Sequence, residues 1–149
     1  MEKSLVLSVS LGTGCYRHIQ IDRGDTLFSL HQAILDSFDF SDDHMHAFFM
    51  SNRAWDGESE FICREGGLDY AQGLTDEVAL SDFNLVKGSK FLYIFDFGDE
   101  WRFQIKVLRA VSESTDMPAI LKSVGLLSQY GHDEDGWDDD WDFKLDDDF

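Results

Sequence analysis

Two histidines separated by one residue, His44 and His46, are the first feature of the sequence that could do chemistry. Asp43 lies directly before them, and Asp42 precedes it. Side chains at positions i and i+2 of a strand point to the same face, so two imidazoles and a carboxylate could share a divalent transition metal. A histidine packed at a strand entry, with its ring N–H on a backbone carbonyl, is the structural alternative. We therefore treat His44, His46 and Asp43 as candidate metal ligands.

Three carboxylates form a second cluster at Asp96, Asp99 and Glu100. Hard divalent cations take carboxylate oxygens as ligands, so these side chains could converge on an ion. Gly98 suggests a different explanation, a hairpin turn in which the glycine takes a positive φ and Asp99 caps the turn with its side chain. The strand-like segments on both sides favour the turn.

Nucleophilic catalysis would need a reactive side chain next to a base. Cys15 and Cys63 are far apart in the sequence, and neither lies in a recognisable nucleophile motif. His18 or His31 could serve as the base only if the fold brings it to a thiol, which the sequence does not determine. Two cysteines without a CxxC pair are typical of reduced, buried thiols in a cytoplasmic protein. We assign no catalytic residue and expect no cofactor other than a possible divalent metal.

The net charge of −18 limits the partners of this 149-residue chain. It argues against direct binding to nucleic acid or to an anionic membrane surface, because both require clustered Lys and Arg. No apolar segment approaches the ~20 residues that span a bilayer. The composition therefore predicts a cytoplasmic protein whose charge serves solubility alone or the binding of a basic partner protein.

The last 17 residues, 133–149, differ in composition from the rest of the chain. They contain ten acidic residues and one lysine, so this segment carries half of the net charge. Purely acidic tails seldom contain many aromatic residues, so part of this one is expected to pack back onto the domain. We divide the chain into a domain at 1–132 and an acidic, aromatic-containing C-terminal tail at 133–149. The aromatic residues of the tail are Trp137, Trp141, Phe143 and Phe149.

The first third of the chain predicts a hairpin and a helix. Apolar residues alternate over 4–11 and again over 15–21, and a short linker with two glycines joins these strands. Asp25 or Thr26 can then cap a helix that runs to Phe38 with one apolar stripe. Weaker predictions follow: a strand at 46–50, a strand at 58–64, a loop at 65–73 and a helical turn within 76–83.

The strongest strands are predicted at 90–97 and 101–109, joined at 98–100. Their alternation places large side chains on one face of each strand, so this hairpin should form the centre of the core. Further along, Asp116 and Pro118 suggest a helix start, and 119–127 predicts a short amphipathic helix. The core residues of the hairpin would be Phe91, Tyr93, Phe95 and Phe97 in the first strand and Trp101, Phe103, Ile105 and Val107 in the second.

The order of these elements indicates the fold class. Two strands, a helix, a strand and then further strands resemble a β-grasp arrangement, in which one helix covers a mixed sheet. We therefore expect a single α+β domain with a mixed β-sheet, one main helix packed on it in a β-grasp-like (ubiquitin-like) arrangement, and a short C-terminal helix.

One segment of the chain resembles the signature of a known family. It reads Tyr93-Ile94-Phe95-Asp96-Phe97-Gly98-Asp99-Glu100-Trp101 and is similar to the aromatic strand, Asp-Phe-Gly-Asp turn, acidic residue and Trp of the plasmid pRiA4b ORF-3-like family. The signature positions are Tyr93, Asp96, Phe97, Gly98, Asp99 and Trp101. Other resemblances follow in the order the family has them: Tyr16 to Ile21, Thr26 to Ile34, His44 to Phe48, and Leu80 to Asp82.

The resemblance covers the chain from about Leu5 to Val107. Members of the family commonly carry a Cys-Pro-Pro-Glu stretch that ends near Gly-Gly-Tyr, and 126–141 contains neither that cysteine nor those prolines. The resemblance thus supports the domain extent and implies no activity. On charge and motifs alone, the leading expectation is a non-enzymatic module that presents an acidic surface and the acidic tail at 133–149 to a basic partner protein. The alternative is a metal-binding protein or metal-dependent enzyme that uses His44, His46 and nearby carboxylates.

Overall fold

In the part of the chain that the structure describes, a single sheet and one α-helix make up the fold. The computed structural model describes residues 2–12, 14–67 and 71–125. Eight strands lie in the order β5-β4-β3-β6-β7-β1-β2-β8, and neighbouring strands are antiparallel except β4 and β5. The strands are β1 (Ser4–Gly12), β2 (Cys15–Asp22), β3 (His46–Phe49), β4 (Glu60–Ile62), β5 (Gly73–Leu74), β6 (Lys90–Phe95), β7 (Trp101–Val111) and β8 (Ala119–Val124). The helices are α1 (Leu27–Phe38) and three 3-10 turns, η1 (Gly57–Ser59), η2 (Arg64–Gly66) and η3 (Leu80–Asp82).

Both predicted hairpins are confirmed. β1 pairs with β2, and β6 pairs with β7. β1 also pairs with β7 on its other side, so the two hairpins together form the middle of the sheet. Leu5, Leu7 and Val9 of β1 are completely buried, as their period-two spacing predicts.

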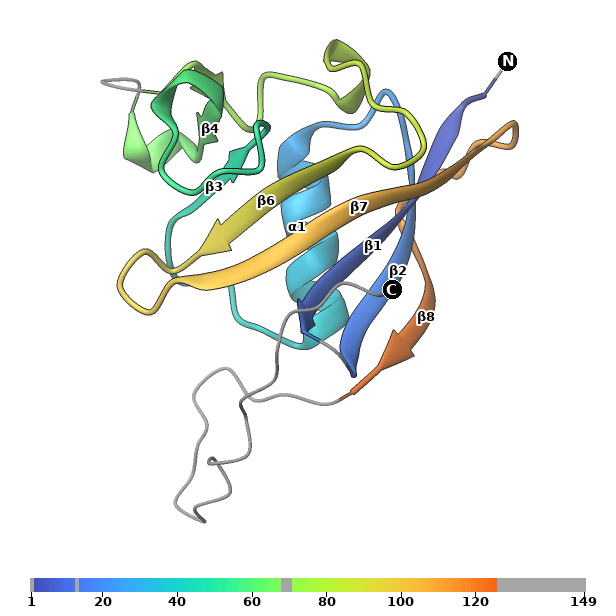
Figure 1. Cartoon of the computed structure of the whole chain (residues 1–149), viewed down its shortest axis with the longest axis horizontal. Coiled ribbons are helices and arrows are strands. Elements are labelled where there is room, and N and C mark those ends of the chain that lie inside the picture. Colours follow the sequence, from blue (N-terminus) through green and yellow to red (C-terminus); the bar gives the residue numbers. More distant parts are fainter. Residues whose placement is uncertain (1, 13, 68–70, 126–149) are drawn as a thin grey trace.

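The helix α1 begins where the sequence predicts it. Thr26 is the N-cap, and its Oγ1 accepts a 3.0 Å hydrogen bond from the backbone N–H of Ser29, which satisfies a free donor of the first turn. Asp39 ends the helix in a left-handed conformation with φ 63°. Figure 1 shows α1 behind the central strands, so it covers one face of the sheet. Among the described residues, no helix has the length and apolar character that a membrane crossing requires.

The β-grasp expectation is wrong. One helix does lie on a mixed sheet, but that sheet has eight strands, and it continues beyond the two hairpins through β3, β4 and β5 on one side and β8 on the other. β1 also lies between β2 and β7, which are distant in the sequence. Such long-range pairing has no local sequence signal, which is why the strand order could not be predicted.

The predicted C-terminal helix is also wrong. Residues Ala119–Val124 form strand β8, which pairs with the outer edge of β2. Pro118 directly precedes this strand, where its missing N–H costs no ladder hydrogen bond. Arg17 of β2 holds the end of β8, because its guanidinium donates to the carbonyl oxygens of Val124 and Gly125 at 2.8 and 3.0 Å. Positions 126–127 of the predicted helix and the predicted tail at 133–149 lie outside the described residues.

The hydrophobic residues form two cores on opposite faces of the sheet. The larger core fills the space between α1 and the sheet, and the predicted hairpin residues Phe91, Tyr93, Phe95 and Phe103 are completely buried in it. The smaller core lies on the other face over β3, β4 and β6. Phe97 belongs to this second core and contacts Trp55 at 5.2 Å between ring centroids. The expectation that Phe97 shares the face of Phe91 is therefore wrong.

The turn between β6 and β7 differs in detail from the predicted one. The positive φ angles occur at Asp96 (70°) and Glu100 (55°) rather than at Gly98. The carboxylate of Asp96, not that of Asp99, caps the turn by accepting 3.2 Å hydrogen bonds from the backbone N–H groups of Gly98 and Asp99. Because Asp96 reverses the local backbone, Phe97 turns to the opposite face from Phe95. The turn itself was predicted correctly, but the residue that makes it was not.

Candidate functional site

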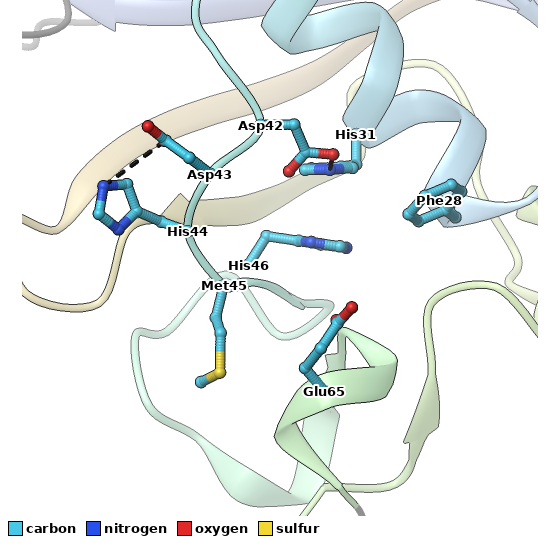
Figure 2. Close-up of a pocket in the computed structure, with 8 residues that line it drawn as sticks. All are labelled: Phe28, His31, Asp42, Asp43, His44, Met45, His46 and Glu65. Carbon is cyan, nitrogen blue, oxygen red and sulfur yellow. Dashed lines mark hydrogen bonds and ion pairs between the residues drawn. The ribbon is translucent and has the colours of Figure 1, made fainter.

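A pocket of about 330 Å³ lies where α1, the segment before β3 and the 3-10 turn η2 meet. We call it the histidine pocket, and Figure 2 shows its side chains. Phe28 and His31 come from α1, while Glu65 comes from η2. The remaining lining residues precede or begin β3: Asp42, Asp43, His44, Met45 and His46.

His31 connects the buried core to the rim of this pocket. Its Nδ1 lies 2.6 Å from the hydroxyl of Tyr93, and its Nε2 lies 3.1 Å from Oδ2 of Asp42. A carboxylate only accepts, so Nε2 donates to Asp42, and the Tyr93 O–H then donates to Nδ1. The resulting chain of hydrogen bonds runs from completely buried Tyr93 through completely buried His31 to Asp42 on the surface.

His46 forms the second imidazole of the pocket. Its ring stacks on that of His31 with 3.6 Å between centroids and 11° between planes. Its Nε2 lies 2.9 Å from the Oγ1 of Thr75, a completely buried threonine that follows β5. Within the described part of the chain, Nδ1 of His46 makes no hydrogen bond. His46 is only 2% exposed and lines the pocket, so Nδ1 is an acceptor or ligand there in the tautomer whose Nε2 donates to Thr75.

Burial keeps both stacked rings neutral. It lowers the pKa of His31, and the hydrogen bond and charge of Asp42 offset only part of that effect. Two effects lower the pKa of His46 to about 2: burial, which is the larger, and the nearby ring of His31. Burial also raises the pKa of the Tyr93 hydroxyl well above its usual value. At neutral pH the interior of the pocket therefore contributes no positive charge.

Carboxylates and apolar side chains share the rest of the lining. Asp42 and Asp43 are about half exposed, and Glu65 directs its carboxylate toward His46 in Figure 2. Phe28 lies beside both stacked rings, at 5.3 Å from His31 and 6.0 Å from His46. The pocket thus combines neutral imidazoles, an aromatic wall and a negatively charged rim.

The predicted metal ligands take different directions in the structure. His46 starts β3 and points into the pocket, whereas the ring of His44, at the pocket's edge, is directed away from that of His46, with distances of 3.5 and 3.4 Å from its Nε2 to oxygens of Asp43 and Asp96. His44 precedes the strand, so the same-face rule for positions i and i+2 does not apply to it. Among the described residues, no three His, Cys, Asp or Glu side chains are grouped so that they could hold a metal ion.

Two of the three carboxylates in the other cluster have partners within the protein, and Asp99 is exposed. Asp96 is 6% exposed and caps the turn described above. Glu100 pairs with Arg102 at 2.7 Å, which directs it along β7. Three signature residues of this segment therefore have structural contacts: Asp96 caps the turn, Phe97 packs in the smaller core, and the hydroxyl of Tyr93 contacts His31.

The thiols are buried and unlike activated nucleophiles. Cys15 and Cys63 are both free and buried, and burial raises the pKa of each thiol. His31 has its two ring nitrogens occupied by Tyr93 and Asp42. These contacts explain why neither cysteine forms a Cys–His pair with His31.

Sequence reasoning identified His46 but missed its partners. His31 appeared only as a remote catalytic candidate, although it follows Leu27 by one helical turn on the buried stripe of α1. A polar residue on such a stripe needs a buried partner, and this was a usable signal. Thr75 and Glu65 had no comparable signal, because they reach the pocket through the irregular segment between β4 and η3.

Comparisons with known proteins agree with the fold. A solved structure of a protein of unknown function, MM3350 from Methanosarcina mazei Go1, is similar to this chain with a TM-score of 0.65 and 27% sequence identity. The match covers 83% of this chain and 70% of that one. The search of the curated proteins found no match. The family model of the plasmid pRiA4b ORF-3-like proteins matches residues 5–127, and the chain belongs to that family.

Proposed function

We propose that this protein is a non-enzymatic binding module that takes a cationic side chain of a basic partner protein into the histidine pocket. The observation that carries the proposal is the combination of three pocket carboxylates with two imidazoles that burial keeps neutral. A pocket with this charge distribution attracts a cation and offers it no competing positive group. The net charge of −18 extends the attraction beyond the pocket.

The lining suits a lysine or arginine side chain in particular. Such a side chain needs carboxylates for its charged end and apolar surface for its stem. Asp42, Asp43 and Glu65 would receive the charge, while Met45 and Phe28 would contact the stem. Phe28 adds the face of an aromatic ring, which attracts guanidinium and ammonium groups. The unpartnered Nδ1 of His46 would accept one N–H of the cation.

The pocket also resembles a catalytic arrangement, and its geometry favours the binding function. Tyr93, His31 and Asp42 follow the hydroxyl–imidazole–carboxylate order of nucleophilic triads. However, the Tyr93 hydroxyl is completely buried beneath His31, and burial raises its pKa. A nucleophile has to reach its substrate in an activated form. The three residues therefore fit a role in orienting the pocket.

The alternative is a divalent metal bound by His44, His46 and Asp43. It requires His44 to rotate away from Asp96 and toward His46, because the two rings point in different directions. Elemental analysis of protein purified without a chelator separates the two functions. Stoichiometric zinc, manganese or iron that is lost in His44→Ala or His46→Ala would replace the cation-binding proposal.

The direct test compares two doubly substituted proteins with equal net charge. Asp43→Asn with Glu65→Gln removes two pocket carboxylates, and Asp36→Asn with Glu58→Gln removes two exposed ones elsewhere. Calorimetry with lysine-rich and arginine-rich peptides should show about tenfold weaker binding for the pocket variant only, equivalent to about 1.4 kcal/mol. Equal weakening in both variants would mean that the peptides recognise overall charge and would overturn the pocket as the binding site.

A further inference from the structure

The sheet face opposite α1 carries a row of basic side chains. We call the part of this face over β7, β1, β2 and β8 the open face; Figure 1 looks onto it. Lys106 pairs across β7 and β1 with Ser8, Ser8 pairs with His18 of β2, and His18 pairs with Lys122 of β8. Cross-strand partners share a face, so these side chains form one row across all four strands.

The charges of this row lack acidic partners in the described structure. Lys106, Lys122 and the neighbouring Arg109 have no carboxylate within 4.0 Å among residues 2–12, 14–67 and 71–125. Arg102, nearer the hairpin turn, pairs instead with Glu100. The pKa of His18 is lowered, mainly by burial and to a smaller extent by the positive charges of Lys122 and Arg109, which shows that both cations lie close to its ring. Three cationic side chains without an acidic partner among the described residues therefore lie together on a chain whose net charge is −18.

A buried hydroxyl at the centre of the row is a second, independent sign of a missing partner. Ser8 is completely buried, and its Oγ has no hydrogen-bond partner among the described residues. The other serines on the same face of β1 do have one: Ser4 donates to the carbonyl of Glu113, and Ser10 donates to that of Gly12. A buried hydroxyl normally has a hydrogen-bond partner, so a ligand group or a water is expected at this position.

We infer that the acidic, aromatic segment 133–149 of the same chain docks on the open face. Its net charge of −9 complements the basic row. β8, the strand that carries Lys122, ends at Val124, so the described chain leaves the sheet at one border of the open face. Residues 126–132 can span roughly 23–25 Å when extended. Crossing from β8 to β7 takes only about 14 Å, because adjacent strands lie about 4.8 Å apart.

The aromatic residues of the segment also find complementary groups. Tyr16 lies on the open face beside His18, with 5.3 Å between the ring centroids. The ammonium group of Lys122 lies over the Tyr16 ring at 5.7 Å. Trp137 and Trp141 can stack against such rings and receive cations from the same side chains. A tethered segment of this length acts at an effective concentration on the order of millimolar, so weak contacts suffice.

Zero-length carbodiimide crosslinking of the full chain tests this arrangement. The reagent joins carboxylates to lysine amines in direct contact, and an equal mixture of light and isotope-labelled protein separates contacts within a chain from contacts between chains. At low salt, tail carboxylates should join Lys106 and Lys122 at least about fivefold more often than Lys87, an exposed lysine outside the open face. Near 0.5 M salt, where the screening length is roughly 4 Å, this preference should disappear.

Two substituted proteins sharpen the result. Lys122→Gln should shift crosslinks to Lys106, whereas Lys87→Gln, the matched control, should leave the pattern unchanged. Crosslinks spread evenly over all lysines, or found only between light and labelled chains, would overturn docking within the chain. A short DNA duplex provides a further comparison: docking predicts that a duplex bound to the open face reduces the crosslinks to Lys106 and Lys122, and crosslinks that persist unchanged while the duplex occupies the face would overturn docking there. None of these measurements depends on the histidine pocket, so they can fail independently of the proposed function.

Discussion

The histidine pocket and the open face carry opposite charge, although one sheet supports both. In the pocket, the histidines lie between α1 and β3, so burial removes their charge and leaves the carboxylates of Asp42, Asp43 and Glu65 to set the sign. Among the described residues no helix covers the central strands on the open face, where Arg109 and Lys122 are exposed and Lys106 is partly exposed. The comparison shows that the sign of a surface follows from burial and strand register, and that net charge does not reveal it.

The first test of this comparison measures how much one side chain in each region contributes to the free energy of unfolding. Phe95→Ala removes a completely buried ring behind the pocket and should lower the free energy of unfolding by about 3–5 kcal/mol. Lys106→Ala on the open face should change it by less than about 0.5 kcal/mol. Urea denaturation of both variants measures the difference. Similar losses in the two would show that the open face carries part of the core.

The second test uses acid, because the pocket buries His31 completely and leaves His46 only 2% exposed. The folded-state pKa of His46, about 2, lies below the ordinary value, so the unfolded chain binds more protons than the folded one below about pH 6.5. Its contribution to stability is therefore complete above pH 6.5 and declines as the pH falls. Between pH 7 and pH 5 the loss from His46 should be about 2 kcal/mol, and His31 adds to it in the same direction.

The measurement for this prediction is urea unfolding at pH 7, 6 and 5. His46→Asn cannot take up this proton and should show a shallower decline with pH than the wild-type chain. His18→Asn, on the open face, serves as the control, because His18 is only partly buried and should alter the slope much less. Equal slopes in the wild type and His46→Asn would contradict a neutral, buried His46.

The third test removes one hydrogen bond beneath the pocket. Tyr93→Phe keeps the ring but leaves Nδ1 of His31 without its donor, which should cost about 1–2 kcal/mol of stability. It should also weaken the binding of a lysine-rich peptide, because the His31 ring loses one of the two contacts that orient it. Unfolding and calorimetry on the same protein check both effects. Unchanged stability together with unchanged binding would show that Tyr93 does not position His31.

The smallest expected effect concerns the electrostatics of the open face. Lys122→Gln should change the free energy of unfolding by less than about 0.5 kcal/mol at physiological salt. Its thermal stability should depend less on salt than that of the wild type, since an attraction to the acidic segment has been weakened. Thermal denaturation over a salt series measures this, with Lys87→Gln as the matched control. The same salt dependence in all three proteins would remove support for docking on this face.

Local sequence patterns predicted much of the fold. Alternation identified β1, β2, β6 and β7, and the Thr26 cap marked the start of α1. The spacing at 119–127 misled, because Ile120 and Leu121 also suit the edge of a sheet, where they are about half exposed. Six residues of β8 are too few to decide between helix and strand without the free edge of β2 beside them.

The candidate site was only partly predictable. His46 follows two aspartates and a histidine in an unusual spacing, so composition alone drew attention to it. Its ring, however, stacks on His31 of α1, and its Nε2 contacts Thr75, which follows β5, so both contacts join elements that are distant in the sequence. Contacts between elements so far apart in sequence exist only after the sheet has assembled.

The sequence by itself determined most of the local structure, though not strand β8, together with the family signature around Asp96 to Trp101 and the overall negative charge. These depend on side-chain type, periodicity and turn chemistry between neighbouring residues. Only the tertiary structure decided which histidines are neutral and where positive charge collects. Burial sets the protonation of His31 and His46, and strand register aligns Lys106, His18 and Lys122 across strands from three parts of the chain. Both properties arise from long-range packing, which is why the same composition yields an acidic pocket and a basic face.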